Sequence, residues 1–171
     1  VNTANSAPTV SPIGDKNVAE ASRLSFLVSA TDPDLPAQSF TFTLEPGAPA
    51  GADLHASAGV FTWTPTESQG PGSYPIKVTV TDNGTPPMSD TKNFTITVVE
   101  ANTRPTLAEI PAQTIEELRE LAFPVVATDS DLPPNKLTFS LGSAAPAGAS
   151  IDAATGVFRW TPTEEQGPKE Y

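Results

Sequence analysis

Carboxylate and amide side chains recur at a regular spacing along this 171-residue chain. The acidic residues of the first half are Glu20, Asp32, Asp34 and Glu67, and their counterparts in the second half are Glu117, Asp129, Asp131 and Glu164. Glu100 and Asn102 lie between the two sets. Ca²⁺ takes about six to eight oxygen ligands from carboxylates, carbonyls and water, so several such groups must converge from separate segments. The chemistry open to these residues is cation binding, provided that the fold brings them together.

A sequence repeat sets these positions. The segment GVFTWTPTESQGPGSY at residues 59–74 recurs as GVFRWTPTEEQGPKEY at residues 156–171, an offset of 97 residues. A period near the size of one domain indicates tandem modules. We therefore expect a linker at residues 1–6, a complete module at 7–101, and a second module at 102–171 that stops before its last two strands.

Apolar residues alternate with polar ones in several short stretches. The stretches are residues 24–30, 40–44, 60–64, 74–80 and 94–98, with weaker ones near 9–13 and 18–20. A period of two marks a strand with one buried face. Residues 115–123 look helical in isolation but align with residues 18–26, so we expect a strand there. About seven strands without a helix predict an all-β fold of tandem immunoglobulin-like Greek-key β-sandwiches.

Three aromatic residues of the repeated segment have alternative interpretations. Trp63 and Trp160 could stack on sugar rings, but they alternate in phase with Phe61 and Phe158, which favours the core. Tyr74 follows a Gly- and Pro-rich corner at the start of the penultimate strand, as in a tyrosine corner whose hydroxyl bonds to upstream backbone. We expect both tryptophans in the core and Tyr74 at such a corner.

Composition excludes some classes of function. A net charge of -11 opposes binding to nucleic acid, whose phosphates need clusters of Lys and Arg, and to anionic membrane surfaces. The sequence contains no run of eighteen apolar residues, so we expect no membrane-spanning helix. His55 is the single histidine and its counterpart is Asp152, so neither a zinc-protease motif nor a serine triad fits the repeat. We therefore expect that the chain has no enzymatic activity. The acidic, Thr-rich, cysteine-free composition is common in secreted and bacterial surface proteins.

The motifs together resemble the cadherin-like repeat, especially its bacterial immunoglobulin-like and dystroglycan-type versions. They are a Glu before the second strand, AxDxD after it, a Glu after the Phe-Trp strand, VTDNGTP, and a linker of the form ExNxxP. The resemblance implies Ca²⁺ at each junction between modules. For the middle junction it implies the ligands Glu20, Glu67, Glu100, Asn102, Asp129 and Asp131, and for a preceding junction Asp32, Asp34 and Asp82. The linker departs from the family's DxNDNxP pattern, because Glu100 replaces the first Asp and Thr103 the central one.

Two of these ligand assignments have structural alternatives. TPTE can form a capping box in which Thr64 is the cap, Pro65 the first helical residue, and Glu67 the side chain that reaches back. Asp32 and Asp34 flank Pro33 in a turn, where Asp is favoured for bonding its own backbone. The sequence leaves both alternatives open.

The leading hypothesis is a non-catalytic extracellular repeat module that acts in adhesion or as a calcium-stiffened spacer of a large surface or secreted protein. The alternative is a carbohydrate-binding accessory module of a secreted polysaccharide-degrading enzyme. Expected partners are neighbouring repeats and a cell-surface protein or polysaccharide. Because the second module would have unpaired strand edges and an open core, we also expect self-association or strand exchange through it.

Overall fold

The computed structural model describes residues 4–171. The chain forms two compact units, one ending at Ala101 and the other comprising Asn102–Tyr171. Helical structure among the described residues is confined to two 3-10 turns, η1 (Glu67–Gln69) and η2 (Glu164–Gln166). The expected all-β class is therefore confirmed. Within residues 4–171, no helix has the length and apolar character needed to cross a lipid bilayer.

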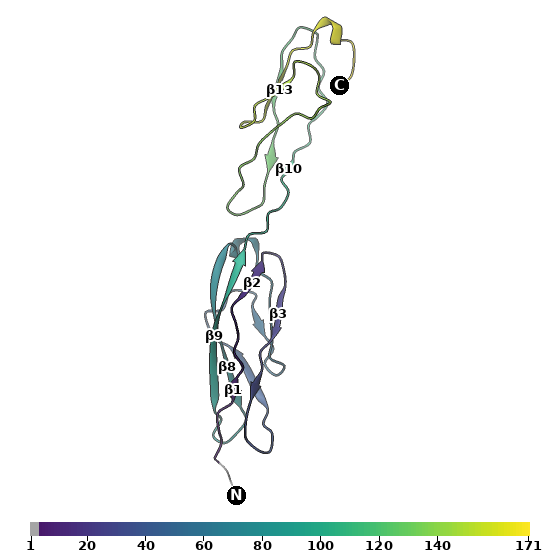
Figure 1. Cartoon of the computed structure of the whole chain (residues 1–171). Coiled ribbons are helices and arrows are strands. Elements are labelled where there is room, and N and C mark those ends of the chain that lie inside the picture. The colour runs from purple at the N-terminus through teal and green to yellow at the C-terminus, as the bar shows by residue number, and fades with distance from the viewer. Residues whose placement is uncertain (1–3) are drawn as a thin grey trace. The chain divides into compact units, whose positions relative to one another are not determined.

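Unit 1 is a sandwich of two sheets (Figure 1). Its strands are β1 (Thr9–Val10), β2 (Lys16–Ala19), β3 (Leu24–Leu27), β4 (Ala30–Thr31), β5 (Phe40–Leu44), β6 (Asp53–Leu54), β7 (Val60–Trp63), β8 (Gly72–Asp82) and β9 (Ser89–Val99). One sheet has the order β2-β9-β8-β5, the other β3-β7-β6, and β1 pairs with β4 at the side. All pairs are antiparallel except β2 with β9, which is parallel. The sandwich is the immunoglobulin-like arrangement expected from the alternating strands.

The alternating apolar residues of both sheets meet in one core. On β8, Ile76, Val78 and Val80 are at most 1% exposed, because every second side chain of a strand points to the same face. They face Phe61 of β7, which is fully buried. Trp63 is 1% exposed and its Nε1 donates to the backbone oxygen of Ala50 at 3.2 Å, so the prediction of a core tryptophan is confirmed.

Tyr74 forms the expected corner before the long strand β8 continues across the sheet. Its hydroxyl donates to the backbone oxygen of Gln69 at 2.6 Å, and its ring packs edge-on against Trp63 with centroids 5.0 Å apart. In unit 2, the hydroxyl of Tyr171 makes the same bond to Gln166, at 3.1 Å. The corner fixes the loop that carries η1.

Unit 2 repeats the smaller sheet of unit 1. Its strands are β10 (Thr106–Leu107), β11 (Leu121–Pro124), β12 (Ala127–Thr128), β13 (Ser150–Ile151) and β14 (Val157–Trp160). The order β11-β14-β13 matches β3-β7-β6, and β10 pairs with β12 as β1 pairs with β4. Strand β11 shows that the stretch which looks helical in isolation ends in a strand, as the alignment of the two repeats predicts.

The larger sheet has no counterpart within unit 2. In unit 1, β5 is held by its ladder with β8 and β2 by its ladder with β9. Residues 102–171 contain no counterpart of β8 or β9, so residues 137–141, which align with β5, form no strand. An open, largely apolar cavity of about 1260 Å³ results, lined among others by Leu121, Phe123, Phe158 and Trp160.

Candidate metal centre at one end of unit 1

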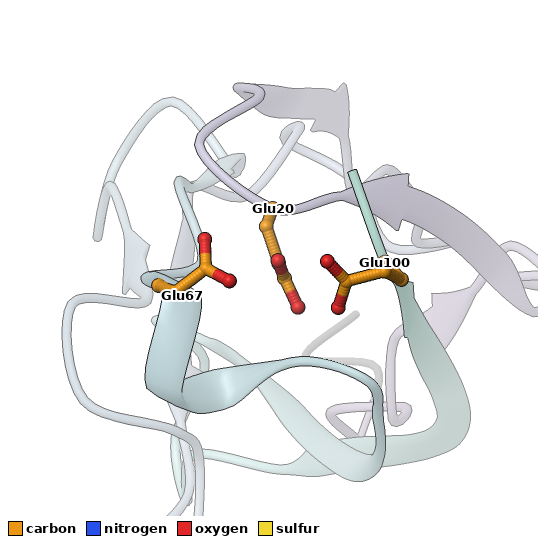
Figure 2. A group of neighbouring side chains, drawn as sticks. All are labelled: Glu20, Glu67 and Glu100. Atoms are coloured by element: carbon orange, nitrogen blue, oxygen red, sulfur yellow. The ribbon is translucent and has the colours of Figure 1, made fainter. Parts of the chain in front are cut away.

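Three glutamate side chains converge at one end of unit 1 (Figure 2). Glu20 directly follows β2, Glu67 is the first residue of η1, and Glu100 directly follows β9. One carboxylate oxygen from each lies within 4.8 Å of the other two. Figure 2 shows the three carboxylates pointing toward one another. The convergence predicted for these residues from the sequence is thus present within unit 1.

The parallel pairing of β2 with β9 places two of the glutamates. Ala19 and Val99 are the last partners of this ladder, so Glu20 and Glu100 are the next residues of two strands that end at the same edge. The backbone N–H of Glu20 continues the ladder to the oxygen of Val99 at 3.2 Å. An antiparallel pair would have sent the two chains to opposite ends, and the carboxylates could not have met.

The third glutamate is placed by η1, and of the two alternatives left open by the sequence the capping box of Thr64 with Glu67 was wrong. The turn is capped by Thr66 rather than Thr64, and the side chain that reaches back belongs to Gln69 rather than Glu67. Gln69 Oε1 accepts from the backbone N–H of Thr66 at 2.9 Å. In unit 2, Gln166 does the same for Thr163, also at 2.9 Å. Gln69 makes the bond that closes the turn, so Glu67 is not part of the cap. The carboxylate of Glu67 is instead directed toward Glu20 and Glu100.

Glu20 is the centre of the cluster. Its side chain is 2% exposed, and neither carboxylate oxygen has a hydrogen bond of ordinary geometry. Burial raises the pKa of Glu20 above its usual value, and the charges of Glu100 and Glu67 raise it further, against a smaller opposing effect of the Ala101 backbone N–H. Unpaired carboxylate oxygens in a buried position are rare in folded proteins. This environment favours either a proton or a cation beside Glu20.

Gly70 lets the carboxylate of Glu20 occupy this position. A Cβ added to Gly70 would lie 1.8 Å from Oε1 of Glu20, and one added to Gly167 would lie 2.0 Å from Oε1 of Glu117. The sequence interpretation missed both glycines, although QGP in both copies of the repeat was the available signal.

The cluster fits a hard divalent cation. Ca²⁺ binds oxygen at about 2.3–2.6 Å, so two ligands of one ion are at most about 5 Å apart, and the three glutamates meet this limit. All three ligand atoms are carboxylate oxygens, which suit Ca²⁺ or Mg²⁺ rather than a metal that prefers thiol or imidazole ligands. Glu20, Glu67 and Glu100 would hold the ion, with water and backbone oxygens completing its shell.

Asp82, a buried acidic residue of unit 1 outside the cluster, is satisfied by protein donors. Asp82 is 4% exposed and accepts from Asn5 Nδ2 and from the backbone N–H groups of Gly84 and Met88, at 3.0 to 3.1 Å. Although burial acts to raise the pKa of Asp82, the donors of Met88, Gly84 and Asn5 outweigh it and hold the pKa below its usual value. These donors favour the charged carboxylate, and the role of Asp82 as a ligand for a preceding junction stays a prediction.

The sequence left open whether Asp32 and Asp34 stabilise a turn or bind a metal ion, and the structure has features of both. Oδ1 of Asp32 accepts from the backbone N–H of Asp34 at 2.8 Å, the turn bond expected for Asp in this position. Oδ2 of Asp32 is buried without a hydrogen-bond partner. Asp34 accepts from the N–H of Ser6 and from Gln38. Their role as ligands for a preceding junction stays a prediction.

The remaining predicted ligands lie in unit 2. Asp131 is 1% exposed, and its backbone N–H donates to Asp129 Oδ1 at 3.0 Å. The side-chain oxygen of Asn102 accepts from Asn135 Nδ2 at 2.9 Å. Participation of Asn102, Asp129 and Asp131 in calcium binding stays a prediction.

A β-sandwich unit followed by a unit that repeats its smaller sheet is the architecture of the cadherin-like and immunoglobulin-like repeats. The family model described as "Putative Ig domain" matches residues 7–99 and 104–169, and the chain belongs to that family. The resemblance stated from the motifs is thereby confirmed.

Solved structures of cadherins share the fold. Mouse cadherin-23 EC22-24 is similar with a TM-score of 0.58 at 22% identity, covering 93% of this chain and 55% of that one. Human CDH23 EC21-23 gives 0.57 at 24% identity, covering 88% and 53%, and the protocadherin gammaB4 extracellular domain gives 0.54 at 20%, covering 94% and 30%. The chain thus spans between 30% and 55% of these structures. No curated protein matches the chain in sequence.

Proposed function

We propose that this chain is a pair of non-catalytic extracellular repeat modules that act as a spacer or in adhesion within a larger surface or secreted protein, with Ca²⁺ bound by Glu20, Glu67 and Glu100. The observation that carries the calcium proposal is the buried carboxylate of Glu20, which has no ordinary hydrogen bond and faces two further carboxylates. Immunoglobulin-like repeats serve mainly as binding and structural modules, which supports a non-catalytic role.

A bound calcium ion supplies positive charge that offsets the repulsion among the three carboxylates. The contribution of the protein is to hold the carboxylates in place. The β2-β9 ladder fixes Glu20 and Glu100, the Gln69 cap and the Tyr74 corner fix the turn that carries Glu67, and Gly70 leaves space for Glu20. Binding would tie the ends of two strands to η1 and stiffen this end of the unit.

A calcium titration followed by thermal unfolding tests the proposal. A ligand at about 100 times its dissociation constant adds about 2.7 kcal/mol to stability, so the melting temperature of unit 1 should rise between chelator and millimolar calcium. Glu67→Gln should abolish most of this rise, whereas Glu45→Gln, a glutamate of unit 1 outside the cluster, should keep it. An equal rise of the melting temperature in both variants, or no rise in the parent chain, would contradict calcium binding by the cluster. The modules would then be spacers without a metal ion.

The carbohydrate-binding alternative receives no support from the tryptophans. Trp63 is 1% and Trp160 9% exposed, so neither offers a flat ring to a sugar. Retardation in gels that contain polysaccharide remains its direct test.

We also propose that unit 2 binds apolar strands through its open cavity. In unit 1 the same face is covered by Ile76, Val78 and Val80 of β8, which supports a strand pair as the occupant. Neighbouring sequence of the parent protein or a second copy of the chain could supply it, as in the strand exchange expected from the sequence.

A further inference from the structure

The residues that lead into unit 2 are bound by a buried aspartate. Both carboxylate oxygens of Asp131 accept from the backbone N–H of Thr103, at 3.1 Å each, and Oδ1 also accepts from the Thr103 hydroxyl. Asn135 Nδ2 donates to Asp131 Oδ2 at 2.6 Å and to Asn102 Oδ1 at 2.9 Å. One carboxylate and one amide therefore hold two consecutive residues, Asn102 and Thr103, against the module that they precede.

Unit 1 has a similar but smaller set of contacts, and those to Asp34 are both on one oxygen. Asp34 Oδ2 accepts from the backbone N–H of Ser6 at 2.7 Å and from Gln38 Nε2 at 3.0 Å. Gln38 Nε2 also donates to Asn5 Oδ1 at 2.6 Å. Ser6 and Gln38 take the places of Thr103 and Asn135, so the pattern persists where both side chains have changed.

The acceptor capacity of Asp131 is filled by these donors. A carboxylate offers about four lone-pair sites, and Asp131 already has two contacts on each oxygen. The residue at position 103 is a threonine, which places no second charge beside Asp131. A hydroxyl and an N–H at this position supply the hydrogen bonds directly.

We propose that Asp34 and Asp131 fasten the two residues preceding their modules by hydrogen bonds alone, so that the entry segment of each module stays fixed without a metal ion. We name this arrangement the entry clasp: Asn5, Ser6, Asp34 and Gln38 in unit 1, and Asn102, Thr103, Asp131 and Asn135 in unit 2. The clasp shares no residue with the Glu20 cluster. Calcium would then act on the end of unit 1 that carries the glutamates and leave the entry segments unchanged.

Amide hydrogen exchange of the full chain, resolved by residue, tests the clasp. In chelator, the Thr103 amide should exchange about tenfold or more slowly than an exposed amide, and millimolar calcium should leave its rate unchanged. Rapid exchange in chelator that becomes slow in calcium would overturn the proposal. This measurement needs no variant, so it tests the protection of the Thr103 amide even if a substitution unfolds unit 2.

A substitution pair adds a causal test. Asp131→Asn should speed exchange of the Thr103 amide about tenfold, because a hydrogen bond to a charged acceptor is replaced by a weaker one. Asp152→Asn is the matched control, since Asp152 also accepts backbone N–H groups in unit 2 but only from its own turn, at Ala154 and Thr155. The amide of Phe123 on β11 serves as a reference for the folding of unit 2. Unchanged Thr103 exchange in Asp131→Asn with β11 intact would contradict the clasp.

Discussion

Gly70 and Glu20 are in direct contact, because a Cβ at residue 70 would lie 1.8 Å from Oε1 of Glu20. The backbone of Gly70 has a φ of -124°, which any residue can adopt, so glycine is needed here for space rather than for conformation. The turn that carries Glu67 thus also positions the carboxylate of Glu20. Gly167 and Glu117 repeat the relationship in unit 2.

Gly70→Ala should displace the carboxylate of Glu20 and weaken calcium binding. Forcing a methyl group into this contact should destabilise unit 1 by about 1–3 kcal/mol, the usual cost of overpacking. Gly14→Ala is the control, since a Cβ at Gly14 meets only the end of Lys16 at 3.9 Å. Calorimetric titration and thermal unfolding measure both effects. Parental calcium affinity in Gly70→Ala would show that the position of Glu20 does not matter for binding.

Glu20→Gln should change stability in opposite directions with and without calcium. The pKa of Glu20 is higher in the folded chain than its ordinary value of 4.5, so between these two values the folded state binds more protons than the unfolded state. The contribution of Glu20 to stability is therefore full below pH 4.5 and is lost as the pH rises through the folded pKa. In chelator at neutral pH the uncharged variant should melt above the parent chain, and in calcium below it.

Melting curves of both proteins between pH 4 and 8 test this prediction. In chelator the difference between variant and parent should grow as the pH rises, because the parent loses stability when Glu20 ionises. Glu45→Gln should show no such growth. A Glu20→Gln variant that melts below the parent in chelator at every pH would contradict the environment assigned to Glu20.

The repeat and its alternation were sufficient to predict the sandwich and the buried Trp63, the Gly- and Pro-rich segment before Tyr74 predicted its corner, and the resemblance to the cadherin-like repeat implied that Glu20, Glu67 and Glu100 converge. The sandwich and its core follow from side-chain alternation, which the sequence carries directly, whereas the parallel pairing of β2 with β9 that places Glu20 and Glu100 was not predicted. The cap at Thr66 could not be predicted, because TPTESQ offers two threonines and two acceptors at suitable spacings. The QGP motif recurs in both copies, but the contact of Gly70 with Glu20 and the filled acceptors of Asp131 depend on tertiary packing, which no spacing encodes.

Tyr74→Phe should destabilise unit 1 by about 1 kcal/mol, because it removes the 2.6 Å bond from the hydroxyl to Gln69 while keeping the ring against Trp63. Since the Gln69 loop carries η1, calcium affinity should fall as well. Tyr171→Phe is the matched control. Its bond is longer, at 3.1 Å, and Tyr171 is 56% exposed, so water replaces the lost partner and the effect should be smaller. Equal losses in both variants, measured by chemical denaturation, would contradict this ranking.

The cavity of unit 2 should make the chain associate with itself. Ile110 lines the cavity and is 44% exposed, whereas its counterpart in unit 1, Ile13, packs against the core. Ile110→Lys places a charge in the cavity, so it should shift the chain toward monomer in light scattering across a concentration series. Leu27→Lys, at a residue 65% exposed on β3 of unit 1, should leave association unchanged. The hydrophobic effect is not specific for one surface, so the contact is assigned to unit 2 only if Ile110→Lys loses association and Leu27→Lys keeps it. A parent chain that is strictly monomeric at every concentration would contradict self-association through the cavity.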